Sequence, residues 1–192
     1  LLAQSSALKQ TKLLYRELKA NPDLVLAYSR GDVIRARNEG KIAAVLSLEG
    51  GEPLGDDPGL LEVFYRLGVR AIGLTWNDRN LLASGVGDSD SGGGLTSLGR
   101  ETVRIAQELG MLLDVSHLSQ RSFWDLMDLT QGPVIASHSS AYTLCAHPRN
   151  LTDEQAQKLA QSGGVIGVNF HSPFLRKQGR AELADVVKHI DY

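Results

Sequence analysis

The sequence has little cysteine, and it lacks both an excess of charge of one sign and any long apolar run. Its 192 residues include a single cysteine, Cys145, which cannot form an internal disulfide. The 20 basic and 22 acidic residues leave a formal net charge of -2. Because nucleic-acid binding draws on clustered lysine and arginine, this balance argues against a nucleic-acid partner. The lack of a possible internal disulfide favours a protein of the reducing cytoplasm.

Signals for membrane attachment are also missing from the sequence. No apolar stretch is long enough to span a bilayer, and neither a signal-peptide pattern nor a hydrophobic tail for a lipid anchor is present. We therefore expect a soluble chain. It starts at Leu1 rather than at a methionine and stops just after the amphipathic segment AELADVVKHI, so we also expect it to be a piece of a longer protein.

What the chain does contain is a regular alternation of strand and helix patterns. Short apolar runs predict buried strands at residues 42–48, 69–75, 111–115, 133–137 and 165–170. Their apolarity is continuous rather than alternating, which is typical of parallel strands covered on both faces. Helical patterns lie between them and upstream, over residues 7–20, 33–38, 58–68 and 96–110, after Ser119, and from Thr152 to Gly163.

This alternation predicts an α/β fold. We favour a (β/α)8 TIM-like barrel of the metal-dependent hydrolase type, with an open doubly wound sheet as the alternative. A complete barrel usually needs about 250 residues, so five strands in this chain predict an incomplete one. We expect a single domain over residues 1–192, with a helical lead-in at 1–40 and strand–helix repeats at 41–192.

Three polar side chains recur at the downstream ends of apolar runs, namely Glu49 in AAVLSLEGG, His117 in GMLLDVSHLS and His138 in GPVIASHSS. The downstream ends of parallel strands share one edge of the sheet, so these residues should converge there. A carboxylate and two imidazoles form a typical zinc-ligand set, and fewer than four protein ligands leave room for a reactive water. The pattern therefore predicts a hydrolytic metal site.

Each of these residues also has a simpler interpretation when taken alone. Glu49 could be a solvated loop residue, and either histidine could be a hydrogen-bonded structural residue. Arg149, just beyond the strand that precedes His138, could clamp a substrate carboxylate or could simply be a surface arginine. A non-catalytic α/β module that holds a small anion through Arg149 and the glycine-rich segment 85–94 is a rival from a different functional class.

Five segments resemble the membrane (renal-type) dipeptidase family: LSLEGGEPL, GVRAIGLTWNDRN, GLTSLGRETVRIAQELGMLLDVSHLS, PVIASHSSAYTLCAHPRN and GVIGVNF. They occur in the family's order and spacing, from about Lys41 to Tyr192. The resemblance implies a (β/α)8 barrel with two zinc ions at the strand ends that hydrolyses dipeptides. It implies that Glu49 bridges the two metals and that His117 and His138 complete the second metal's site.

The same resemblance matches Arg149 to the arginine that receives the dipeptide's terminal carboxylate. We also assign Trp76 and Asn77, in the segment LTWN, to substrate binding. Trp76 stands where the best-known members have a histidine that supports the transition state, which implies a different or broader substrate preference. The His-x-Asp pair that the family's first metal needs is missing before Glu49, and the family's late aspartate is not found either.

We therefore expect zinc-dependent hydrolysis of dipeptides by a metal-bound hydroxide, with Glu49, His117 and His138 as the catalytic and metal-binding residues. Another metal-dependent amidohydrolase or a lactonase on the same barrel is the alternative activity. The partners expected are a dipeptide substrate and, as an assembly to test, a homodimer. Tested alone, the 192-residue chain should bind at most one zinc ion firmly and should be poorly active or inactive.

Overall fold

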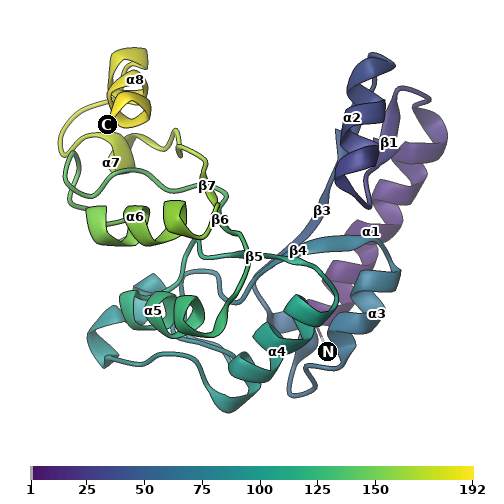
Figure 1. Cartoon of the computed structure of the whole chain (residues 1–192), viewed down its shortest axis with the longest axis horizontal. Coiled ribbons are helices and arrows are strands. Elements are labelled where there is room, and N and C mark those ends of the chain that lie inside the picture. The colour runs from purple at the N-terminus through teal and green to yellow at the C-terminus, as the bar shows by residue number, and fades with distance from the viewer. Residues whose placement is uncertain (1) are drawn as a thin grey trace.

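The computed structural model describes residues 2–192, with helices and short parallel strands alternating along most of the chain (Figure 1). In order, the elements are α1 (Leu2–Ala20), β1 (Leu24–Leu26), α2 (Arg30–Asn38), β2 (Ile42–Ala44), β3 (Leu46–Glu49), η1 (Glu52–Leu54), α3 (Leu60–Arg66), β4 (Val69–Gly73), η2 (Val86–Ser91), α4 (Ser97–Glu108), β5 (Leu112–Asp114), α5 (Gln120–Leu129), β6 (Val134–Ala136), α6 (Asp153–Gln161), β7 (Val165–Ile166), α7 (Ser172–Leu175) and α8 (Leu183–Asp191).

The main sheet has five strands in the order β3-β4-β5-β6-β7, and every pair is parallel. Sequence order and spatial order are therefore the same, as in a barrel; a doubly wound sheet reverses its order at a switch point. Figure 1 shows α3, α4, α5 and α6 on the convex side of the curved sheet. The predicted α/β class and the barrel-type order of the strands are confirmed.

All five predicted strands are present, but the lead-in is not purely helical. Residues 1–40 also contain β1, which pairs in parallel with β2. Its run Leu24–Leu26 has only three residues, too short to stand out from the helical patterns on either side. The first predicted strand, at residues 42–48, is divided into β2 and β3 at Val45, and the register shifts between Leu46 and Ser47.

Side-chain oxygens cap α4, α5 and α6, the helices that follow β4, β5 and β6. Thr96 accepts a hydrogen bond from Gly99 N at the start of α4, and Ser119 accepts one from Ser122 N at the start of α5. Thr152 and Gln155 form the predicted capping box at the start of α6. Each cap satisfies a backbone donor that the first helical turn leaves unpaired, so it defines where the helix begins.

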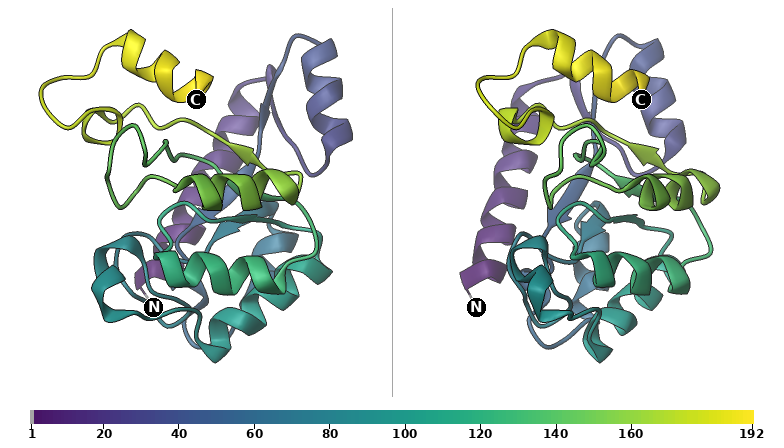
Figure 2. Two further views of the ribbon diagram at one scale, coloured as in Figure 1. Left: turned by 60° about the vertical axis from the view of Figure 1, so that its left-hand side comes forward. Right: turned by 90° about the vertical axis from the view of Figure 1, so that its left-hand side faces the viewer.

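The core lies between the sheet and its covering helices. Ile72, Leu113 and Val134 from three neighbouring strands are almost fully buried and belong to one apolar cluster with Leu61 of α3 and Phe123 of α5. This packing fixes the strands relative to one another, and it thereby fixes where their downstream ends meet. In both views of Figure 2 the N-terminus and α8 lie at opposite ends of the molecule.

Over residues 2–192, no helix is both long enough and apolar enough to cross a bilayer.

Candidate metal centre

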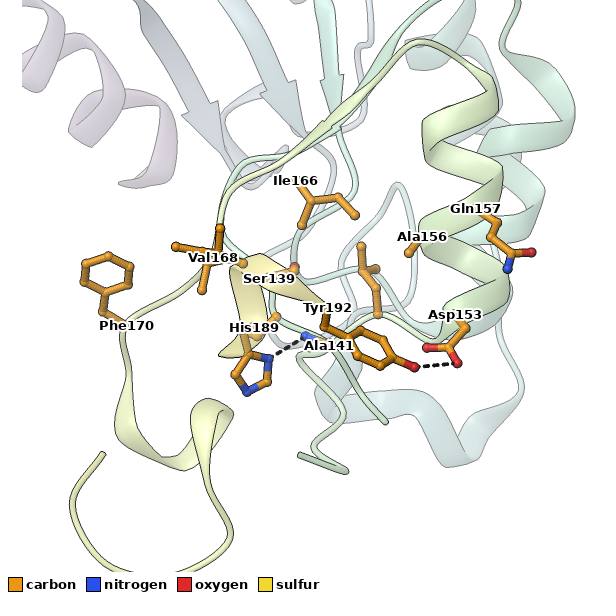
Figure 3. A pocket seen from close by; sticks show the side chains of 13 residues that line it. Ser139, Ala141, Asp153, Ala156, Gln157, Ile166, Val168, Phe170, His189 and Tyr192 are labelled. Carbon is orange, nitrogen blue, oxygen red and sulfur yellow. Dashed lines mark hydrogen bonds between the residues drawn. The ribbon is translucent and has the colours of Figure 1, made fainter. Parts of the chain in front are cut away.

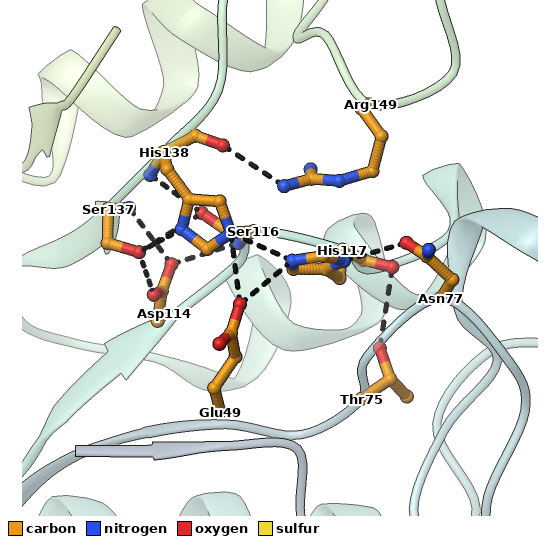
Figure 4. A network of polar contacts seen from close by, with 9 residues as sticks. All are labelled: Glu49, Thr75, Asn77, Asp114, Ser116, His117, Ser137, His138 and Arg149. Atoms are coloured by element: carbon orange, nitrogen blue, oxygen red, sulfur yellow. Dashed lines mark hydrogen bonds and ion pairs between the residues drawn. The ribbon is translucent and has the colours of Figure 1, made fainter. Parts of the chain in front are cut away.

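The downstream edge of the sheet brings Glu49, His117 and His138 together (Figure 4). Glu49 is the last residue of β3, while His117 and His138 lie in the loops that follow β5 and β6. Glu49 Oε1 lies 3.1 Å from Nε2 of each histidine, and the two Nε2 atoms lie 2.8 Å apart. These residues form the one group of potential metal ligands found among the described residues, with all ligand atoms within 4.8 Å of one another.

The backbone at His117 is held in an unusual conformation. Its φ of 73° is in the left-handed region, where no other non-glycine residue of the described part of the chain lies. The carbonyl of His117 accepts hydrogen bonds from Val86 N at 2.9 Å and from Thr75 Oγ1 at 3.4 Å. Residues in such conformations gather at functional sites, where surrounding contacts compensate for their strain. Here those contacts turn the imidazole toward Glu49 and His138.

His117 is also kept in its neutral form. Only 6% of the residue is exposed. Burial, followed by the positive charge of Arg149 and by His138, lowers the pKa of His117 to about 3. A neutral imidazole has a free nitrogen lone pair, which is what a metal ion requires of a histidine ligand.

The second ring nitrogen of each histidine faces away from the cluster and meets a polar partner. His117 Nδ1 lies 2.8 Å from Asn77 Oδ1, and His138 Nδ1 lies 2.7 Å from Ser137 Oγ. An amide oxygen can only accept a hydrogen bond, so His117 donates from Nδ1. The Nε2 lone pair of His117 then points at the cluster, in the arrangement that metal-binding histidines commonly have.

This donor set fits a divalent metal ion. The carboxylate of Glu49 is 57% exposed and thus accessible. Two nitrogens 2.8 Å apart would repel one another through their lone pairs unless a proton or a cation lies between them. One carboxylate oxygen and two imidazole nitrogens match the ligands that zinc takes in proteins.

Arg149 lies over the same cluster. The residue is only 5% exposed, and its Nη2 donates a hydrogen bond to His138 O at 3.1 Å. Burial lowers the pKa of Arg149, while the charges of Asp114 and Glu49 act in the opposite direction. In Figure 4 its guanidinium points toward the two imidazoles. Arg149 and His117 both line a cavity of about 350 Å³. The simpler interpretation of Arg149 as a surface residue is therefore wrong.

Trp76 and Asn77 lie in the loop after β4, next to His117. Trp76 is 54% exposed, and its ring centroid lies 5.8 Å from that of His117. An exposed indole beside a potential metal ligand is available to a bound molecule. Asn77, by contrast, has its side-chain oxygen engaged by His117. The substrate-binding roles of Trp76 and Asn77 stay predictions.

A cavity of about 890 Å³ lies elsewhere, between α6, β7 and α8 (Figure 3). It is lined largely by apolar side chains such as Ile166, Val168 and Phe170, and by none of the three clustered residues. His189 at its wall accepts a hydrogen bond from Ala141 N at 3.0 Å. This cavity does not contain the donor set.

Two residues behind the cluster, Asp114 and Ser137, were not predicted from the sequence. Asp114 ends β5 and Ser137 directly precedes His138, and a hydrogen bond from Ser137 Oγ to Asp114 Oδ2 joins them. Their positions in the sequence could have pointed to them, because Asp114 lies at a strand end and Ser137 directly precedes one of the predicted histidine ligands.

Comparison with known proteins places this chain in one family. The family model described as "Membrane dipeptidase (Peptidase family M19)" matches residues 3–192. An uncharacterized protein in the pqqA 5' region of Klebsiella pneumoniae is 41% identical over 88% of this chain and 66% of its own length. An uncharacterized dipeptidase of Schizosaccharomyces pombe is 43% identical over 90% of this chain and 43% of its own length.

Solved structures agree with these sequence matches. A metallo peptidase from Rhodobacter sphaeroides, liganded with a phosphinate mimic of the dipeptide L-Ala-D-Ala, superposes with a TM-score of 0.87 at 32% identity. The match covers 94% of this chain and 54% of that one. This chain thus spans between about two fifths and two thirds of the length of these relatives. With a family match over nearly all of its residues, the chain belongs to the membrane dipeptidase family.

Proposed function

We propose that this chain supplies a metal site and a carboxylate-binding arginine to a zinc-dependent dipeptidase. The observation that carries the proposal is the convergence of Glu49, His117 and His138 at one edge of the sheet, with ligand atoms 2.8 to 3.1 Å apart. The family and the dipeptidase names of its relatives support dipeptides as the substrate class. The single domain over residues 1–192, the cytoplasmic location and the homodimer stay predictions.

Glu49, His117 and His138 are the residues that would hold zinc. When bound, zinc supplies Lewis acidity toward a peptide carbonyl and lowers the pKa of water. Glu49 contributes the negative charge that offsets the metal's own, and burial keeps His117 neutral and able to ligate. The described residues form one such ligand group, so we expect this chain to bind at most one zinc ion firmly, although the family implies two.

Arg149 would orient the substrate. Its buried guanidinium beside the cluster can pair with the terminal carboxylate of a dipeptide, which would place the scissile carbonyl at the metal site. Burial strengthens such a pair because little water competes for the charges.

Replacing Arg149 by methionine should therefore raise the KM for dipeptides. The lost charge-assisted hydrogen bonds correspond to about 1.5–3 kcal/mol, or roughly a 10- to 150-fold change. Steady-state kinetics of the complete gene product measure it, with Arg149→Lys as the variant that keeps the charge. Dipeptide amides, which lack the carboxylate, should be hydrolysed equally by the wild type and by Arg149→Met. Equal KM values for free dipeptides would contradict the assignment.

The function itself is tested by removing and restoring the metal. The complete gene product, stripped by a chelator, should lose dipeptide hydrolysis and regain it with zinc, while the isolated 192-residue chain should be poorly active. Lactones and phosphoesters assayed in parallel separate a dipeptidase from other hydrolases on the same barrel. A protein that binds no zinc would favour the anion-binding module instead.

A further inference from the structure

We propose that Asp114 and Ser137 are positioning residues: they hold the His138 ring as its Nδ1–H tautomer and thereby set the zinc affinity of the cluster. This inference rests on the proposed function, because it takes Glu49, His117 and His138 as the ligands. It adds a hydrogen-bond relay, Asp114–Ser137–His138, that lies behind the ligands (Figure 4).

The direction of the relay follows from counting hydrogens. The carboxylate of Asp114 can only accept hydrogen bonds, so the hydroxyl of Ser137 donates its single hydrogen to Asp114 Oδ2. Ser137 Oγ can then only accept from His138 Nδ1, 2.7 Å away. The imidazole must therefore carry its hydrogen on Nδ1, and its Nε2 lone pair is left facing Glu49 and His117.

Asp114 is well placed to impose this direction. It is 7% exposed, and its second oxygen, Oδ1, accepts hydrogen bonds from Ser116 N at 2.9 Å and Ser137 N at 3.0 Å. These two bonds prevent the carboxylate from turning and link the loop after β5 to the loop after β6. His138 N also donates to Ser116 Oγ at 3.1 Å, so the backbone on both sides of the relay is tied to the same loop.

Replacing Asp114 by asparagine should exchange the donor and acceptor roles along the relay while leaving its heavy atoms in place. The two backbone donors require the carbonyl oxygen of the new amide at the Oδ1 position, so its NH2 group takes the Oδ2 position and donates to Ser137. The hydroxyl of Ser137 then donates to His138 Nδ1, and the ring hydrogen moves to Nε2. The nitrogen that faces the cluster would thus be blocked for metal binding.

Two readouts on the 192-residue chain test the proposal. Long-range ¹H–¹⁵N NMR of the metal-free chain, at one fixed pH at which both imidazoles are neutral and share no proton between their Nε2 atoms, reports the tautomer of His138, and competition with a chromophoric chelator gives the Kd for zinc. We expect Nδ1–H in the wild type and Nε2–H in Asp114→Asn, whose zinc affinity should fall by about 10- to 100-fold, as for other outer-sphere partners of metal ligands. Ser137→Ala should give mixed tautomers and about a 10-fold loss.

Two further variants separate positioning from packing. Ser137 is exposed, and Ser137→Thr keeps the hydroxyl, so this variant should restore both the tautomer and the affinity. Ser139→Ala removes the neighbouring hydroxyl, which is buried without a hydrogen-bond partner in the described structure, and should behave as the wild type. Circular dichroism of each variant checks that it is folded.

The outcomes distinguish this proposal from the function on which it rests. If Asp114→Asn and Ser137→Ala retain both the wild-type tautomer and the wild-type Kd, the relay is wrong while the metal site stands. If the wild-type chain binds no zinc, the proposed function fails and the claim about affinity fails with it. Should Asp114→Asn unfold, Ser137→Ala alone tests the relay. Ser137 lies at the surface, so its replacement is not expected to unfold the chain.

Discussion

Replacing His138 by alanine is expected to abolish firm zinc binding by this chain. The side chain provides one of three ligand atoms, and its Nε2 lies 2.8 Å from that of His117 and 3.1 Å from Glu49 Oε1. Losing a ligand should weaken binding by at least about 100-fold, more than the loss of an outer-sphere partner. Isothermal titration of zinc into the metal-free chain measures the change.

The matched control is His171→Ala. This histidine also follows a sheet strand, but its ring packs against Phe174, and it is not among the clustered ligands. We expect zinc binding by His171→Ala to equal that of the wild type. Equal losses of zinc affinity in the two variants would mean that zinc binds to histidines in general and not specifically to the cluster of Glu49, His117 and His138.

Replacing Gly99 by alanine should cause a large loss of stability. Gly99 lies in the first turn of α4, where a Cβ atom would come 2.0 Å from Leu82 O and 2.9 Å from Leu82 C. Thr96 N donates to the same carbonyl at 2.9 Å, so the segment at Leu82 cannot move away without losing contacts at the start of the helix. We expect a loss of about 3 kcal/mol, the upper end for overpacked sites.

For a chain of this size such a loss lowers the Tm by roughly 6–12 °C in thermal unfolding. Gly31→Ala provides the control, because Gly31 also lies in a helix, α2, but its added Cβ would meet Ser29 Oγ at an ordinary 3.5 Å. That variant should be unchanged or slightly stabilised, since alanine is the better helix former. A Gly99→Ala protein as stable as the wild type would show that α4 can move away from Leu82.

Much of the fold and the position of the ligands could be predicted because both follow from short-range patterns. Continuous apolar runs locate the parallel strands, and a polar residue at the end of each run must lie at the shared edge of the sheet. Glu49, His117 and His138 could therefore be predicted to lie together without any knowledge of distances. The start of α6 could also be predicted, because its capping box is a purely local signal.

Other features depend on contacts between distant segments and left no local signal. β1 is a strand only because β2 lies beside it. The positive φ of His117 is imposed by hydrogen bonds from Thr75 and Val86, neither of which is near it in sequence. Asp114 was visible at a strand end, but its partner Ser137 comes from the next strand–helix unit. Such tertiary pairings cannot be deduced from spacing alone.

The most direct test of the metal site is to locate zinc in the loaded protein by anomalous diffraction or X-ray absorption. The account predicts one ion in this chain with a Glu49 oxygen and Nε2 of His117 and of His138 at about 2.0–2.2 Å. An ion bound at other residues, or a histidine of this group bound through Nδ1, would contradict it.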